Sequence, residues 1–281
     1  MLIVDAHPHI YSPDSAKYPT IDVPWEPGEP AAVANLKRRM DDAGVGRAVF
    51  IQTGTFYAFD NRYVMDSAKA NATWACGVVT LSPDDPSHLD VLEEGVRKFS
   101  VRGMRGIPDR ISRISSPNVY RLWTKARDLG IPVNCMVMDD LDRVPEIEKV
   151  AGDLPDLRIV LDHCFLMNTR HNLEPTLAAL KRLSARPNIY AKLTCGTHGS
   201  YRVYPHTDMH GPLKQVIEWF TPNRCVWGSN FPNALWSKGS SYKQNLTLFT
   251  EELGLSRAEQ TGVLSTTALK LWFPRDASPG T

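Results

Sequence analysis

The strongest constraint on the fold is a regular alternation between short apolar segments and longer segments with helical periodicity. Each apolar segment is rich in aliphatic or β-branched residues and has the length of a buried strand. Strands that are buried on both faces read as continuous apolar runs, which is typical of parallel sheets. Eight such segments occur, at Leu2–Ala6, Arg47–Thr53, Trp74–Leu81, Val101–Ile107, Ile131–Val137, Arg158–Cys164, Ile189–Cys195 and Cys225–Ser229.

The intervening segments carry start and stop signals of helices. Ser116-Pro117 opens one segment, and Gly130 follows its end. Ser256 and Glu259 form a capping-box pattern at the last one. Further helices are expected to open at Glu29-Pro30, Asp60, Asp85-Pro86 and Glu174-Pro175. Strands that alternate with helices predict parallel β-α units.

Eight β-α units in 281 residues predict a (β/α)8 barrel, which typically takes about 250 residues. Residues 1–281 contain no repeat, linker or low-complexity segment, so we expect a single domain. The alternative is an open doubly wound sheet, which usually has a glycine-rich turn after its first strand. That turn reads His7-Pro8-His9 and has no glycine, which favours the barrel.

Composition excludes several classes of function. The chain has 32 Lys and Arg against 31 Asp and Glu, so its near-neutral charge gives no reason to expect nucleic acid as a partner. No apolar run approaches the ~18 residues that span a membrane, and the N-terminus lacks the pattern of a signal peptide. We therefore expect a cytoplasmic protein without a membrane partner. The five cysteines form no CxxC pair and are expected to be buried, reduced thiols.

Polar residues at the ends of the predicted strands are candidate site residues, because a (β/α)8 barrel places its active site at the C-terminal ends of its strands. His7 and His9 follow the first strand, and their spacing points both imidazoles to one side, where they could bind zinc or a substrate carbonyl. Gln52 ends the second strand and Tyr57 lies in the aromatic loop after it. Both are candidate substrate contacts, with loop capping and plain packing as the alternatives.

The later strands add further candidates. Arg102 and Arg105 face opposite sides of the fourth strand, so one of them is placed to hold a substrate carboxylate or to pair with an acidic strand residue. His163 ends the sixth strand. The seventh strand and the loop after it contribute Lys192, Thr194, His198 and Tyr201, while His206 and His210 are expected on an exposed helix face. Asn230 follows the eighth strand and cannot act as a general base, because an amide takes up no proton near neutral pH.

These residues resemble the amidohydrolase superfamily, and in particular its amidohydrolase-2 branch with 2-pyrone-4,6-dicarboxylate lactonase and sugar-acid lactonases. The resemblance rests on His7-Pro8-His9, Asp162-His163 and the segment Trp227–Pro232, supported by Gln52 and by the arginines of the fourth strand. It covers nearly the whole chain. It implies a distorted (β/α)8 barrel and hydrolysis at a carbonyl group.

The resemblance leaves the cofactor open. Some relatives use one zinc ion and others use no metal, so we expect either no cofactor or a single divalent metal, zinc first, held by His7, His9 and His163. A two-metal site is not expected, because the fourth and fifth strands offer Arg105 and Asn134-Cys135-Met136 rather than lysine or histidine ligands.

The resemblance also exposes a departure at position 230. Relatives usually carry an aspartate there that assists the attack of water, whereas this chain has Asn230. Three interpretations remain: an introduced change that traps substrate, a subgroup that uses another base such as His163 or His7, or a loss of hydrolysis.

The resemblance predicts a hydrolase that opens a small carboxylated or polyhydroxylated lactone. His7, His9, His163 and Asn230 are the expected catalytic positions, and Gln52, Tyr57, Arg105, Lys192, Thr194, His198 and Tyr201 are the expected substrate contacts. The alternatives are a metal-dependent decarboxylase of the same superfamily and a binding protein without catalytic activity. The expected partner is a small organic acid lactone.

Overall fold

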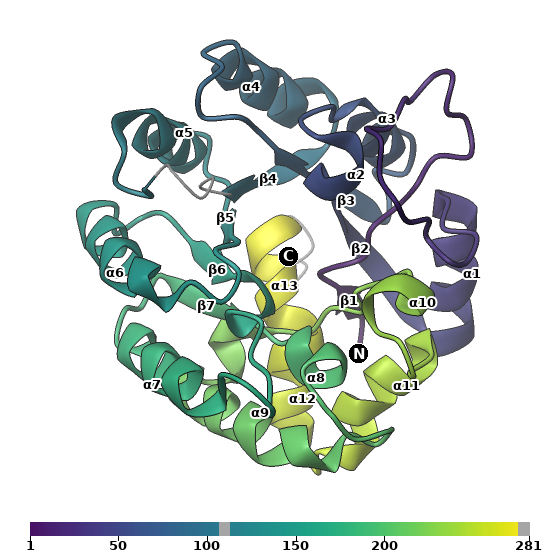
Figure 1. Cartoon of the computed structure of the whole chain (residues 1–281), viewed down its shortest axis with the longest axis vertical. Helices are drawn as coiled ribbons and strands as arrows, with labels where there is room; N and C mark the ends of the chain where they lie inside the picture. Colours follow the sequence, from purple (N-terminus) through teal and green to yellow (C-terminus); the bar gives the residue numbers. More distant parts are fainter. Residues whose placement is uncertain (107–112, 275–281) are drawn as a thin grey trace, which may run out of the picture.

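Eight parallel strands lie side by side in chain order, each hydrogen-bonded to the next. Figure 1 shows them arranged in a ring. The structure is a computed structural model that describes residues 1–106 and 113–274. The predicted (β/α)8 architecture is confirmed, and every strand lies within or overlaps a predicted segment. The strands are β1 (Ile3–Asp5), β2 (Val45–Ile51), β3 (Ala75–Thr80), β4 (Val101–Gly106), β5 (Val133–Cys135), β6 (Ile159–Leu161), β7 (Ile189–Lys192) and β8 (Cys225–Val226).

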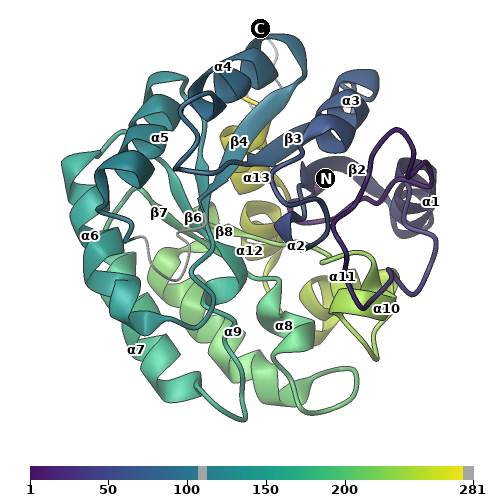
Figure 2. The same cartoon turned by 45° about the horizontal axis from the view of Figure 1, so that its top comes forward.

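Helices surround the strands, and Figure 2 shows α4 to α7 ranged along the outside of the sheet. The α-helices are α1 (Val33–Ala43), α2 (Gly54–Tyr57), α3 (Arg62–Ala70), α4 (His88–Lys98), α5 (Pro117–Asp128), α6 (Val144–Asp153), α7 (Leu173–Ser184), α8 (Cys195–His198), α9 (Thr207–Phe220), α10 (Asn233–Trp236), α11 (Tyr242–Thr247), α12 (Arg257–Thr261) and α13 (Thr267–Trp272). The short helical segments are η1 (Leu141–Arg143), η2 (Asp162–Cys164), η3 (Pro222–Arg224), η4 (Leu248–Glu252) and η5 (Gly262–Thr266). None of the helices in the described part of the chain is long and apolar enough to cross a membrane.

The seam between the first and last strands is closed by the segments that follow them. The Ala6 N–H donates to the Trp227 carbonyl at 3.1 Å, and the Asn230 N–H donates to the His7 carbonyl at 2.9 Å. The His9 N–H completes this series at the Phe231 carbonyl. The two candidate segments from opposite ends of the chain are therefore held together by backbone hydrogen bonds.

The C-terminal helix α13 lies at the centre of the ring of strands in Figure 1. Its Leu271 and Trp272 are buried in one apolar cluster with interior residues of the strands, among them Val49, Val160 and Val226. Because apolar burial is the main stabilising term in folding, this cluster ties the end of the chain to the barrel.

The sixth strand ends three residues earlier than predicted. It ends at Leu161, because His163, Cys164 and Phe165 have positive φ angles of 55°, 47° and 59°, a conformation that a strand does not accommodate. Sequence patterns signal such turns through glycine, and none is present here. The Sγ of Cys164 lies 3.3 Å from the Lys192 carbonyl.

Other boundaries also differ from the predictions. Helix α1 begins at Val33, so Glu29-Pro30 lies ahead of it, and α7 begins at Leu173, one residue before Glu174-Pro175. Ser256 caps α12 in a capping box with Glu259, as predicted. The predicted strand residue Ile107 lies outside the described residues. The side chains of Cys76, Cys135 and Cys225 are buried free thiols, as expected, and Cys164 is also buried.

We expect Trp272→Ala to lower the free energy of unfolding by about 3–5 kcal/mol, because it empties a large volume inside the barrel. The measurement is urea unfolding followed by circular dichroism. Trp219→Ala, on the half-buried outer face of α9, is the matched control and should cost clearly less. Equal losses for the two variants would show that α13 does not stabilise the barrel.

Candidate active site

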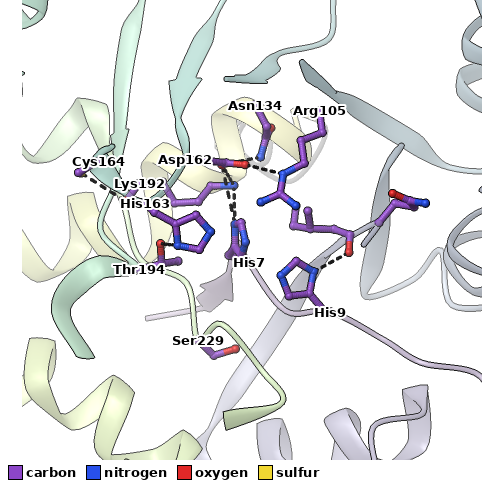
Figure 3. Close-up of polar contacts among 12 residues, drawn as sticks. His7, His9, Arg105, Asn134, Asp162, His163, Cys164, Lys192, Thr194 and Ser229 are labelled. Atoms are coloured by element: carbon purple, nitrogen blue, oxygen red, sulfur yellow. Dashed lines mark hydrogen bonds and ion pairs between the residues drawn. The ribbon is translucent and has the colours of Figure 1, made fainter. Parts of the chain in front are cut away.

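The centre of the barrel mouth is the buried carboxylate of Asp162, which Figure 3 shows surrounded by side chains from four other strands. Its Oδ1 accepts from Lys192 Nζ at 2.8 Å and from Asn134 Nδ2 at 3.2 Å. Its Oδ2 accepts from Arg105 Nε at 3.1 Å, and Oδ1 lies 3.8 Å from His7 Nδ1. Residues from β1, β4, β5 and β7 thus converge just after β6.

This cluster carries one more positive than negative charge, since Lys192 and Arg105 share a single carboxylate. Buried charges are costly unless they are paired and hydrogen-bonded, and Asp162 provides that pairing for both cations. Burial lowers the pKa of Lys192, while the adjacent Asp162 opposes that effect. Arg105 is the predicted inward-facing arginine of β4, whereas Arg102 donates to backbone carbonyls of Val96 and Val101.

Four imidazoles form a row across the mouth, in the order His9, His7, His163 and His198. The ring centroids of successive members lie 4.9, 4.4 and 5.1 Å apart. His163 Nδ1 lies 2.8 Å from Thr194 Oγ1 and 3.1 Å from His198 Nε2. The structure therefore brings together all three predicted catalytic histidines, with Thr194 and His198 beside them.

Hydrogen bonds fix the proton positions of two of these rings. His9 Nδ1 lies 2.8 Å from the Ile51 carbonyl, which only accepts, so Nδ1 carries the proton and Nε2 is left with a lone pair. His7 Nδ1 lies 3.2 Å from the ammonium of Lys192, which only donates. His7 therefore holds its proton on Nε2, a buried atom with no hydrogen-bond partner among the described residues.

His7, His9 and His163 are buried and His198 is half-buried, and this environment keeps all four rings neutral. Burial lowers the pKa of His9 to about 3 and that of His198 to about 4. It lowers the pKa values of His7 and His163 well below the usual range, with Lys192 lowering that of His7 further and His198 that of His163. Neutral imidazoles donate or accept single hydrogen bonds at physiological pH but are weak bases.

A second buried carboxylate, that of Asp5, holds the backbone of His7 in place. Its Oδ1 accepts the backbone N–H groups of Ser229 at 2.8 Å and His7 at 3.1 Å, and its Oδ2 accepts the Tyr242 hydroxyl at 2.9 Å. Gly228 lies against His7, where an added Cβ would come within 2.5 Å of the His7 Cβ. The apolar pattern placed Asp5 in the first predicted strand but did not predict these contacts. Nothing in the sequence indicated a role for Tyr242.

Gln52 and Tyr57, the substrate contacts predicted at the second strand and in the loop after it, form hydrogen bonds with other groups of the protein. Gln52 Nε2 donates to the carbonyls of Ala58 and Asp60, as expected for a loop-capping amide, and its buried Oε1 has no partner in the described part of the chain. The Tyr57 hydroxyl accepts the Ser12 N–H at 2.8 Å and lies in an aromatic cluster. The other aromatic of this loop, Phe59, lines a cavity of about 960 Å³ that also reaches Arg105.

Tyr201 lies away from the buried cluster, at a polar depression of about 390 Å³ that also includes His198. Its side chain is 48% exposed, and its ring faces the guanidinium groups of Arg170 and Arg202. The expectation that His206 lies on an exposed helix face was wrong. His206 is buried, and its ring nitrogens contact the Arg202 carbonyl and the Ser240 hydroxyl.

Asn230 is buried at the seam, next to His7. Its backbone has a φ of 53°, a left-handed conformation that asparagine and aspartate adopt more readily than other side chains that carry a Cβ. Its Nδ2 donates to the Trp236 carbonyl at 3.2 Å. The backbone at position 230 therefore suits either asparagine or aspartate, and the amide of Asn230 provides a donor where the resemblance predicts a carboxylate.

A family model described as Amidohydrolase matches residues 4–273. L-fucono-1,5-lactonase of Burkholderia ambifaria is 27% identical over 255 residues, which cover 82% of this chain and 80% of that protein. D-galactarolactone isomerase of Agrobacterium fabrum is 25% identical over 260 residues, covering 89% and 83%. The crystal structure of an amidohydrolase from Burkholderia multivorans with bound zinc aligns with a TM-score of 0.79 at 21% identity, over 97% of this chain and 99% of that chain.

The expected zinc ligands do not fit a zinc ion in this chain. Zinc needs a lone pair on each imidazole, but His7 carries its proton on Nε2 and turns Nδ1 toward Lys192. The cluster already has an excess positive charge, and Asn230 provides no anionic ligand. Among the described residues, no group of three or more histidine, cysteine, aspartate or glutamate side chains is arranged to hold a metal.

Asp162→Asn should lower the free energy of unfolding by about 3–5 kcal/mol, because it leaves Lys192 and Arg105 buried without a counter-charge. Urea unfolding at pH 7 measures the change. Asp153→Asn, which removes an exposed helical pairing with Lys149, is the control and should have little effect. A loss for Asp162→Asn no larger than that of the control would contradict this account of the site.

Stability should fall as the pH drops below about 6.5. The unfolded chain binds protons on its histidines from that pH downward, whereas folded His9 and His198 stay neutral to about pH 3 and 4. Each then costs about 1 kcal/mol between pH 7 and pH 5.5. Urea unfolding at both values should show that His9→Asn reduces the pH-dependent loss by about 1 kcal/mol. The exposed control His171→Asn should leave the loss unchanged, and an unchanged loss in both variants would refute the prediction.

Proposed function

The chain belongs to the amidohydrolase family, and from this membership and the geometry of the barrel mouth we propose that it hydrolyses a small carboxylated or polyhydroxylated lactone. Two relatives that match most of the chain are named for lactone substrates, a lactonase and a lactone isomerase. Family membership supports hydrolysis at a carbonyl, and the relatives support a lactone as the form of that carbonyl.

The observation that carries the proposal is the buried Nε2–H of His7. It has no partner among the described residues, and a buried donor without a partner costs free energy unless a ligand accepts from it. The lactone carbonyl oxygen is the proposed acceptor. Lys192 is then a positioning residue, because its ammonium sets the tautomer of His7.

The proposed reaction adds water to the lactone carbonyl carbon. Negative charge develops on the carbonyl oxygen, where the His7 Nε2–H and the positive charge of Lys192 and Arg105 stabilise it. The bond between the carbonyl carbon and the ring oxygen then breaks, and the ring oxygen takes up a proton. The products are one hydroxycarboxylate and one proton for each lactone and water consumed.

The proton of the attacking water needs an acceptor, and the site supplies only weak ones. Asn230 cannot accept it, and the Asp162 carboxylate is occupied by Lys192 and Arg105. His163 is the proposed base, since an Nδ1–H shared between Thr194 Oγ1 and His198 Nε2 leaves the Nε2 lone pair available. Its lowered pKa makes it a weak base, so we expect slow turnover.

Binding without hydrolysis is the second candidate function, because the amide of Asn230 is hydrogen-bonded to the Trp236 carbonyl at the position where the resemblance predicts a carboxylate. The metal-dependent decarboxylase alternative receives no support from the donor set, which does not fit a divalent ion. Turnover of any lactone by the chain would rule out the binding-only function.

The test is hydrolysis of a lactone panel with carboxylated, alkylated and polyhydroxylated members, followed by proton release. We expect slow opening by the natural chain and an increase of about 100-fold in kcat for Asn230→Asp, which restores a general base. His163→Ala should lower kcat of the natural chain by about 100-fold. The exposed control His171→Ala should leave kcat unchanged. Failure of both the natural chain and Asn230→Asp to open any lactone would refute the proposal.

A further inference from the structure

The cavity of about 960 Å³ beside Arg105 has walls from the loops after β2, β3 and β5 and from the end of β4. It is lined by Gly54 and Phe59 after β2, by Thr80 at the end of β3, and by the segment 136–138 after β5. Arg105 on β4 is the residue that both lines this cavity and contacts Asp162. A ligand in the cavity therefore reaches the buried polar cluster at its positively charged side.

Two large apolar side chains from different loops are exposed at this cavity. Phe59 is 46% exposed and Met138 is 51% exposed, whereas most large apolar residues of the described chain are buried. Both are presented by unusual backbone, since Met138 has a φ of 56° and Ala58, just before Phe59, a φ of 49°. Such conformations are costly for residues with a Cβ and cluster at binding sites.

Several polar groups on these walls are engaged with neighbouring protein atoms. Arg143 pairs with Asp140 at 2.9 Å. The Thr80 hydroxyl lies 3.5 Å from the Gln52 carbonyl, and the Ser82 hydroxyl accepts the Asp84 N–H at 3.3 Å. Hydroxyl groups of a bound sugar acid would have to compete with these protein partners for hydrogen bonds, which reduces what they gain by binding here.

From these observations we infer that the cavity binds the apolar substituent of a monocarboxylated substrate, with its carboxylate at Arg105 and its alkyl or aryl part between Phe59 and Met138. This inference rests on the proposed function for the chemistry at the lactone ring, and it narrows the substrate class to lactones with an apolar substituent. It separates this chain from enzymes for sugar-acid lactones, whose substrates need hydrogen-bond partners along their whole length.

Binding of simple carboxylates tests the cavity without any catalytic step. The probes are butanoate, hexanoate, octanoate and gluconate, titrated into the full chain by calorimetry. The affinity should rise up to about fourfold for each added methylene along the alkyl series, as expected for burial of an alkyl chain. Gluconate should bind more weakly than hexanoate. Gluconate binding as tight as hexanoate, or affinity independent of chain length, would overturn the inference.

Substitutions in the cavity wall test where the alkyl chain of the carboxylates binds. Phe59→Ser and Met138→Ser should each reduce the gain from butanoate to octanoate by at least threefold. Val203→Ser, at an exposed valine of the Tyr201 depression, is the matched control and should keep the full gain. A gain that is the same in all three variants would place the alkyl chain elsewhere and refute the assignment.

Lactone turnover separates this inference from the proposed function. With Asn230→Asp as the enzyme, alkyl-substituted monocarboxylated lactones should exceed their hydroxylated counterparts at least tenfold in kcat/KM. Preference for the hydroxylated lactones would overturn the inference while the proposed hydrolysis stands. Chain-length-dependent binding of the carboxylates without opening of any lactone would leave the cavity assignment in place and refute the hydrolysis.

Discussion

The pairing of one buried carboxylate with two buried cations is the constraint on which the barrel mouth depends. Asp162 contacts Lys192, Arg105 and Asn134, and so links the ends of β4 to β7 at one point. Three charged groups inside a protein are tolerated only when each is paired and hydrogen-bonded. The ends of these strands are therefore positioned by electrostatics as well as by apolar packing.

The same pairing sets the chemistry of the histidines. The ammonium of Lys192 requires a lone pair on His7 Nδ1, which puts the His7 proton on Nε2, a buried atom with no partner among the described residues. Excess positive charge and burial keep the neighbouring imidazoles neutral. The mouth is thus arranged to stabilise a developing negative charge, with a weak proton acceptor at His163 and an amide at Asn230.

Several residues of the candidate site have unusual backbone conformations. His163 and Asn230 both have left-handed φ angles, and so does Met138 at the adjoining cavity. Each lies just beyond the end of a strand, where the chain turns sharply. Its side chain therefore does not follow the alternating directions of the side chains in that strand. Apolar and charged walls meet at Arg105, so one ligand with an apolar part and an acidic part fits both.

The sequence by itself determined the order of strands and helices, because apolar periodicity and capping residues act over neighbouring positions. It also placed His7, His9, Arg105 and His163 at strand ends, where a barrel collects its site. Only the tertiary structure decided that Lys192 lies against His7, 185 residues away, and that Tyr201 lies apart from the buried cluster. Tautomers, ion pairs and pKa values depend on contacts between distant segments and on burial, which local sequence patterns do not encode.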